Sequence, residues 1–179
     1  MRDDAARSLS FGAAETLWEN DRVGAGMQRW RREFPDVDCS GKAVVGRLLH
    51  LNEVFLAAIN RTLTRHRLKY PTFAVLATLR VQGAPYRMSP KALLDTLILT
   101  SGGLSNLLRR LEKAGHIRRM ADETDGRGVI VELTESGRML VEPAMRDHAE
   151  TERRLVAMLS SAERTQVSSS LGKMMLGKL

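Results

Sequence analysis

The segment SGGLSNLLRRLEKA, residues 101–114, carries polar side chains whose types and helical spacing suit the recognition of DNA bases. Ser105 and Arg109 are four residues apart, which places them on one face of a helix. Arginine can pair with guanine in the major groove and asparagine with adenine, so Arg109 and Asn106 are candidate base-reading residues. An amphipathic helix with a solvated basic face is the alternative interpretation of this pattern.

The two ends of this helix supply further candidate DNA contacts. Arg110 and Lys113 suit phosphate oxygens, because contacts to the backbone mainly set the position of a protein on DNA. Thr100 can cap the helix, Ser101 opens it, and Gly102 allows DNA or a neighbouring helix to approach closely. The glycines lack the following Lys-Ser/Thr pair of a nucleotide-binding loop, which argues against that function.

Two short helices and a β-hairpin are predicted to position these residues. Ser89 is a capping residue followed by proline at the first helical position, so it starts the first helix. The second helix turns its leucines inward and ends near Gly115, a suitable left-handed residue. Residues 116–120 and 129–134 alternate and are rich in β-forming side chains, which predicts a hairpin beside this helix-turn-helix.

Longer helices are expected on both sides of this region. From Lys42, apolar residues recur at three- and four-residue steps, which predicts one helix of about 24 residues. Pro71 opens a helix that ends at Gly83 and is followed by a short extended link. Thr134 caps a helix to about residue 158, and Ser160 begins an S-x-x-E capping box for the last helix.

The chain therefore divides into four expected regions. The first contains helical material that Gly24, Gly26 and Pro35 are expected to interrupt. The apolar stripe of the helix from Lys42 and the apolar end of the last helix need a partner surface, which suggests a dimer. The expected regions are an N-terminal helical extension over 1–41, a long dimerisation helix over 42–69, a winged helix-turn-helix DNA-binding region over 70–134, and C-terminal dimerisation helices over 135–179.

The net charge of +7 is concentrated in the middle of the chain. Residues 42–99 hold nine basic and two acidic side chains, which equals the whole excess. A focused basic region suggests an anionic partner such as the backbone of a nucleic acid. A solvated basic face is the alternative explanation.

The composition also narrows the class of protein. Aromatic residues make up only 4%, so the core must consist mainly of Leu, Val, Ala and Met, which favours helices. Neither an apolar run of about 18 residues nor a signal peptide is evident, so we expect a cytoplasmic protein without membrane contact. Scattered histidines, a single cysteine and the lack of catalytic motifs indicate no metal site, no cofactor and no enzyme activity.

The recognition helix and hairpin resemble the winged-helix core of the MarR-type transcriptional regulators. The matching motifs are L-E-x-x-G, D-x-R in the wing and L-T-x-x-G, carried by Leu111, Glu112, Gly115, Asp125, Arg127, Leu133, Thr134 and Gly137. The resemblance implies a mainly α fold with a small β-hairpin wing and a dimeric architecture. It also implies a homodimer that reads a palindromic operator on double-stranded DNA, most often as a repressor relieved by a small aromatic or acidic ligand.

The wing supplies the remaining candidate DNA contacts, Arg118, Asp125 and Arg127. Arg118 belongs to the basic first strand of the hairpin. In the D-x-R pattern, we expect the carboxylate of Asp125 to hold the guanidinium of Arg127 and to aim it at the minor groove.

The N-terminal extension is similar to the branch of this family that has an added N-terminal helix, some members of which respond to urate or related aromatic acids. Trp30 aligns with a tryptophan of the ligand site in that branch, while Ala74 and Leu107 replace an expected acid and arginine. A different aromatic ligand is therefore left open, as is a packing role for the tryptophan. The candidate ligand-binding residues are Trp30, His50 and Phe73.

Two other functions compete with ligand-responsive DNA binding. A winged-helix module can serve protein contacts without an operator. Alternatively, Cys39 could sense oxidants, although its neighbours Asp36 and Asp38 disfavour a reactive thiolate.

Overall fold

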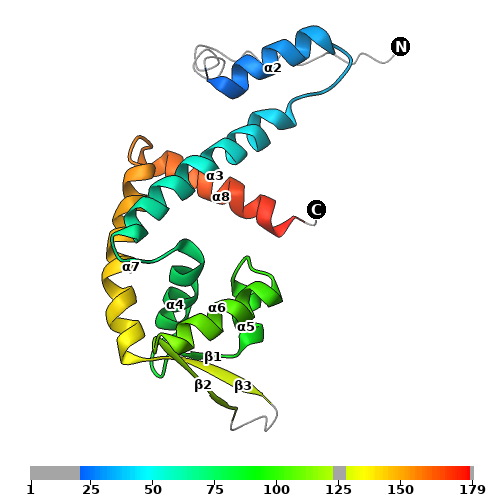
Figure 1. Ribbon diagram of the computed structural model, residues 1–179. Helices are drawn as coiled ribbons and strands as arrows, with labels where there is room; N and C mark the ends of the chain where they lie inside the picture. The colour runs from blue at the N-terminus through cyan, green and yellow to red at the C-terminus, as the bar shows by residue number, and fades with distance from the viewer. Residues whose placement is uncertain (1–20, 123–127, 178–179) are drawn as a thin grey trace. The chain divides into compact units, whose positions relative to one another are not determined.

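The computed structural model describes residues 21–122 and 128–177, which are mostly helical with one small three-stranded sheet (Figure 1). This arrangement confirms the expected mainly α fold with a small β wing. The chain forms two compact units, Met1–Val54 and Phe55–Leu179, which divide within one long helix.

The first unit contains α2 (Arg22–Glu33) and the first half of α3 (Gly41–Thr64). Asp21 caps α2 by accepting a 2.7 Å hydrogen bond from the backbone N–H of Gly24. The expectation that Gly24 and Gly26 would interrupt this helix was wrong, because α2 runs through both. Glycine weakens a helix by about 1 kcal/mol relative to alanine, a cost that the cap and packing against α3 can offset.

The packing of α2 against α3 is close. A Cβ atom on Gly46 of α3 would lie 3.0 Å from a methyl carbon of Val23, so glycine permits this approach. The Asp21 carboxylate also accepts a 2.8 Å hydrogen bond from Arg47 of α3. The loop between the two helices is thereby closed by both apolar and ionic contacts.

Helix α3 has the expected length of 24 residues. It also contains an 18-residue window with a mean hydropathy of 1.2, so by length and composition it could cross a membrane. The expectation of no such segment was wrong by this measure, because leucine and valine raise the average although polar residues interrupt the run. One such helix is weak evidence for a membrane span.

The second unit is built around one apolar core. Its helices are α4 (Tyr70–Val81), α5 (Pro90–Thr96), α6 (Ser101–Lys113), α7 (Glu135–Leu155) and α8 (Ser161–Leu176). The side chains that are fully buried include Leu63, Leu76, Leu79, Leu93, Leu104, Ile117, Val131 and Val141. These residues come from α3 to α7 and from the sheet, so the helix-turn-helix and the wing share one core.

The sheet has three strands in the order β1-β3-β2, formed by β1 (Arg87–Met88), β2 (Ile117–Ala121) and β3 (Val129–Leu133). The short extended link expected before α5 therefore contains a strand, which was not predicted. Tyr86 has a positive φ of 61°, and its carbonyl accepts a 3.1 Å hydrogen bond from the N–H of Leu133. This contact brings the following residues beside β3, where Arg87 pairs with Glu132.

Four predicted helix starts are confirmed by their capping hydrogen bonds. Ser89, Thr100 and Thr134 each accept a hydrogen bond from the backbone N–H three residues later. Ser160 and Glu163 form the reciprocal capping box of α8. Such contacts are local in sequence, which makes them predictable without the fold.

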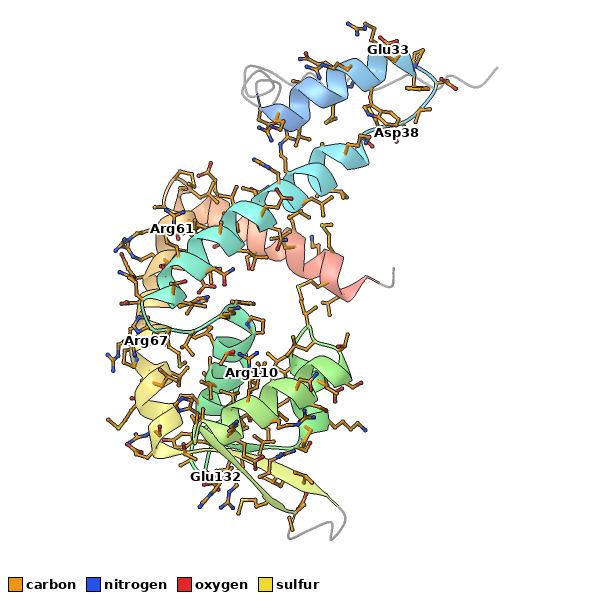
Figure 2. All side chains as sticks on the ribbon, in the orientation of Figure 1. Glu33, Asp38, Arg61, Arg67, Arg110 and Glu132 are labelled. Atoms are coloured by element: carbon orange, nitrogen blue, oxygen red, sulfur yellow. The ribbon has the colours of Figure 1, made fainter. Side chains whose placement is uncertain are left out.

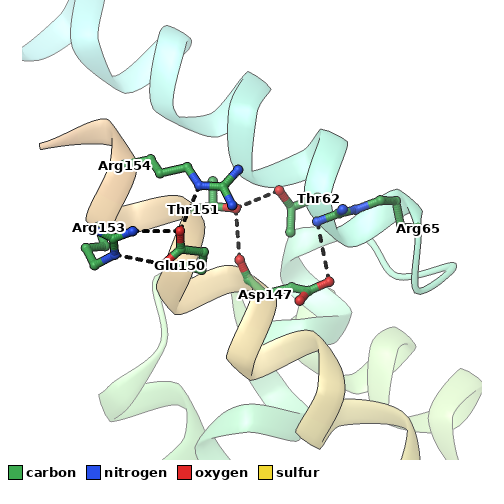
Figure 3. A network of polar contacts seen from close by, with 7 residues as sticks. All are labelled: Thr62, Arg65, Asp147, Glu150, Thr151, Arg153 and Arg154. Atoms are coloured by element: carbon green, nitrogen blue, oxygen red, sulfur yellow. Dashed lines mark hydrogen bonds and ion pairs between the residues drawn. The ribbon is translucent and has the colours of Figure 1, made fainter. Parts of the chain in front are cut away.

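A polar network fastens the end of α3 to α7 (Figure 3). The hydroxyl groups of Thr62 and Thr151 lie 2.8 Å apart, and Thr151 also donates to the carbonyl of Asp147 at 2.9 Å. The Asp147 carboxylate pairs with Arg65 at 3.4 Å and with His66 at 2.9 Å. These contacts connect the start of the winged-helix core to the long helix that follows it.

Candidate nucleic-acid interface

The helix-turn-helix is formed by α5 and α6, which are joined by a short turn. Ser89 accepts a 3.2 Å hydrogen bond from the N–H of Ala92 at the start of α5. Thr100 accepts a 3.1 Å hydrogen bond from the N–H of Gly103 at the start of α6. Both helix starts are therefore fixed by side chains, which sets the direction in which α6 leaves the core.

Helix α6 has one buried face and one exposed polar face. Leu104, Leu108 and Leu111 are buried, as expected for the inner face of the helix. Leu107 is half-buried and lies at the edge of that face. The predicted DNA-binding residues of this helix are all exposed: Ser101, Gly102, Ser105, Asn106, Arg109, Arg110 and Lys113. Figure 2 marks Arg110 on this helix. The fold thus brings together the candidates that the sequence placed on α6.

The basic side chains of α6 differ from most arginines of the second unit. Arg109, Arg110 and Lys113 form no ion pair with any residue that the structure describes, whereas Arg118 and Arg119 of the adjacent strand are both paired. Unpaired exposed cations beside a helix-turn-helix can meet phosphate oxygens without first breaking an internal contact.

The first turn of α6 is open to a close neighbour. A Cβ atom on Gly102 would meet no described atom within 4 Å, whereas one on Gly103 would lie 3.0 Å from the capping hydroxyl of Thr100. Gly103 therefore accommodates the cap. Gly102 leaves backbone exposed at the positive end of the helix dipole, where an anionic group is favoured.

Arg118, a predicted DNA contact, is already engaged in the sheet. Its guanidinium donates to Glu132 at 2.5 Å, and Arg87 donates to the other oxygen of the same carboxylate at 2.5 Å. Glu132 is buried, and Figure 2 labels it at the sheet. Burial alone would raise the pKa of Glu132, but the hydrogen bonds from Arg87 and Arg118 outweigh it and hold the pKa below its ordinary value.

The next residue of the strand, Arg119, is held by the recognition helix. Its side-chain Nε donates to Glu112 at 2.8 Å, and its backbone N–H donates to the same carboxylate at 3.3 Å. The guanidinium hydrogen bond lowers the pKa of Glu112 and raises that of Arg119. Sequence reasoning missed this contact, although Glu112 is part of the L-E-x-x-G motif.

Asp125 and Arg127 at the tip of the wing lie outside the described residues. The described strands meet near this tip through a 2.9 Å hydrogen bond from the N–H of Asp122 to the carbonyl of Gly128. The proposed carboxylate–guanidinium pair at the tip is therefore still a prediction.

The junction between α6, β2 and α7 explains the glycines of the two motifs. Gly115 has a φ of 74° and ends α6, as predicted. Thr134 donates to its carbonyl at 2.6 Å, and the N–H of Thr134 donates to His116 at 3.0 Å. Gly137 lies so close that its absent Cβ would overlap the carbonyl of His116. The spacing of L-E-x-x-G and L-T-x-x-G was the available signal for this contact.

The candidate ligand residues belong to two different units of the chain. Trp30 is 39% exposed, with the Lys42 ammonium 4.2 Å from its ring centroid, and it lines a pocket of about 180 Å³. His50 lines a different pocket, of about 270 Å³, in the same unit. Phe73 belongs to the second unit, where it is buried with its ring centroid 4.7 Å from that of His148. Trp30 and His50 thus line two different pockets.

The alternative sensing chemistries gain little support. Cys39 is a free thiol that is buried at the start of α3, where oxidants have poor access. Over residues 21–122 and 128–177, no three His, Cys, Asp or Glu side chains gather as a metal site would require.

A capped helix-turn-helix with an exposed polar second helix and an adjacent β wing defines a winged-helix DNA-binding protein. Residues 57–143 match the family model described as "Transcriptional regulator SarA/Rot". The HTH-type transcriptional regulator PecS of Dickeya dadantii is 35% identical over 147 residues, which cover 82% of this chain and 89% of that protein. The chain belongs to the MarR family of winged-helix transcriptional regulators and is not an enzyme.

Solved structures share this fold. BpsR of Bordetella bronchiseptica, from a study of how 6-hydroxynicotinic acid regulates its DNA binding, is 27% identical. Its TM-score is 0.67, with 75% of this chain and 94% of that chain covered. A mutant of E. coli MarR in complex with operator DNA has a TM-score of 0.66 and 24% identity, covering 81% of this chain and 96% of that chain. At this level of identity, the likeness to MarR shows a shared fold and nothing more.

Proposed function

We propose that this DNA-binding transcriptional regulator acts as a homodimeric repressor that reads a palindromic operator and is released by a small aromatic or acidic ligand. The proposed regions are the extension 1–41, the dimerisation helix 42–69, the DNA-binding region 70–134 and the C-terminal dimerisation helices 135–179. The proposed DNA contacts are Thr100, Ser101, Gly102, Ser105, Asn106, Arg109, Arg110, Lys113, Arg118, Asp125 and Arg127.

The exposed face of α6 carries this proposal. Its hydroxyl, amide and guanidinium groups project from a helix whose start is capped and whose opposite face is anchored in the core. Asn106 and Arg109 can read base edges in the major groove, while Arg110 and Lys113 hold the backbone. A cytoplasmic location suits such a protein.

Dimerisation is supported by apolar surface on two helices. In α8 no described residue is buried, although the helix ends in apolar side chains. The exposed apolar residues of α3 and α8 include Val44, Val45, Leu49, Val54, Val167, Met174, Met175 and Leu176. A second copy of the chain could cover these surfaces. Two-fold symmetry would then match a palindromic operator.

Ligand control is supported by the relatives. BpsR is described as regulated by 6-hydroxynicotinic acid, and a further structural neighbour, RdhR-CbdbA1625, was solved with 2,4-dichlorophenol bound. Both molecules are small aromatics. Trp30, His50 and Phe73 are the residues we propose for such a ligand.

A binding assay on selected DNA tests the proposal that the protein recognises a specific DNA sequence. Duplexes enriched from a random pool by the purified protein should shift in a gel at lower protein concentration than scrambled duplexes. The shift should weaken with rising salt, because phosphate contacts release counterions. Equal affinity for selected and scrambled DNA would contradict the proposal and favour a protein-interaction module.

A further inference from the structure

Strand β2 of the wing is held on both of its faces by carboxylates. Successive residues of a strand point to opposite faces, so Arg118 and Arg119 project in opposite directions. Arg118 meets Glu132 within the sheet, and Arg119 meets Glu112 on α6. Each arginine of this consecutive pair therefore has a different fixed partner.

The Glu132 contact also reaches the start of the helix-turn-helix. Arg87, Glu132 and Arg118 are cross-strand neighbours in one row of the sheet. Arg87 belongs to β1, which ends one residue before Ser89, the cap of α5. The buried carboxylate thus ties the wing to the segment from which α5 begins.

The Glu112 contact reaches the other end of the helix-turn-helix. Glu112 lies in the last turn of α6, and its carboxylate receives hydrogen bonds from both the side chain and the backbone of Arg119. The hairpin is consequently ion-paired near the beginning of α5 and near the end of α6.

We propose that Glu112 and Glu132 are positioning residues for DNA recognition, which fix the wing to both ends of the helix-turn-helix so that α6 and the wing meet DNA in one set geometry. This inference rests on the proposed function. Neither carboxylate is expected to touch DNA, because each would repel phosphate. Their contribution is to sequence selectivity, which requires that groove and backbone contacts form together.

Neutralising either carboxylate distinguishes a positioning role from a general effect of charge on DNA affinity. Glu112→Gln and Glu132→Gln each make the reading head more positive, which by charge alone should tighten binding to any DNA. If the carboxylates position the wing, affinity for a selected duplex should fall while affinity for a scrambled duplex stays equal or rises. We expect the ratio of the two affinities to fall by at least about threefold, the effect of losing one modest ion-pair contact.

Fluorescence anisotropy with a duplex selected from a random pool and its scrambled counterpart measures this ratio. Glu150→Gln is the matched control, because Glu150 pairs with Arg153 and Arg154 on α7 rather than with the wing. It should leave the ratio unchanged. Exchanging the pair, Glu112→Arg with Arg119→Glu, keeps the net charge and should restore part of the selectivity that Glu112→Gln loses.

Thermal unfolding of each variant checks that the fold persists. If Glu132→Gln does not fold, Glu112→Gln still tests the inference, because the Glu112 side chain is 34% exposed against 11% for Glu132. Ratios within twofold of wild type in both folded single variants would overturn the inference, and so would an exchange variant as unselective as Glu112→Gln. A wild-type protein without selectivity would instead contradict the proposed function.

Discussion

A Cβ atom on Gly137 would lie 2.1 Å from the backbone carbonyl oxygen of His116, well inside any permitted contact. Gly137→Ala should therefore push the start of α7 away from the α6–β2 junction. Overpacking of this kind costs about 1–3 kcal/mol. We expect a lower melting temperature by calorimetry. A variant as stable as wild type would show that the junction can relax.

Gly102 provides the opposite case, because a Cβ there would meet no described atom within 4 Å. Gly102→Ala should keep or raise the melting temperature, since alanine favours a helix by up to about 1 kcal/mol. Operator affinity should nevertheless fall if DNA approaches this backbone. Gly172→Ala, at a similarly open helical position in α8, is the control for the stability effect. Unchanged DNA affinity in Gly102→Ala would contradict the prediction that DNA approaches the backbone at Gly102.

Arg109 is expected to read a base. Arg109→Ala should lose about 1–3 kcal/mol of discrimination between a selected duplex and single-base variants at the contacted position. Arg153→Ala, which removes an exposed arginine of α7, should leave discrimination unchanged. An equal loss of affinity for all duplexes would indicate that Arg109 contacts the DNA backbone instead of a base.

Leu49 is 65% exposed on α3 and is expected to be covered in a dimer. Leu49→Asp should shift the protein toward monomers in sedimentation analysis, because it would place a charge in an apolar interface. Val81→Asp is the control, since Val81 is equally apolar, 67% exposed and outside α3 and α8. A Leu49→Asp protein with the wild-type mass would contradict an interface at this part of α3.

The wing contacts should depend on pH in a defined direction. The pKa of Glu132 in the folded protein is held below the ordinary value of 4.5, so its ion pairs stabilise the fold above about pH 4.5. This stability is lost as the pH falls through the lowered pKa. The difference in melting temperature between wild type and Glu132→Gln should therefore be constant near neutral pH and shrink in acid. A difference that does not change with pH would point to packing rather than charge.

The sequence was informative where structure depends on neighbouring residues. The caps at Ser89, Thr100 and Ser160 join groups three residues apart, so their patterns predicted the helix starts correctly. The leucine spacing of α6 likewise placed its polar residues on the exposed face.

The missed features depend on residues that are distant in sequence. Strand β1 has only two residues and forms because Arg87 pairs with Glu132, 45 positions later. Helix α2 continues through Gly24, and its neighbour Val23 packs against Gly46 of α3, a contact that helix propensity does not describe. The ion pair of Arg118 with Glu132 was not predicted for the same reason, because the register of the strands decides which side chains meet.

The basic side chains of α6, which pair with no described residue, determine how DNA binding should respond to salt. If Arg110 and Lys113 each neutralise one phosphate, the two together displace condensed counterions from the duplex. A rise in salt from 50 to 200 mM should then weaken binding by about 12-fold per protomer through these two residues alone. The fraction of DNA bound at a given protein concentration would thus depend on the ionic strength.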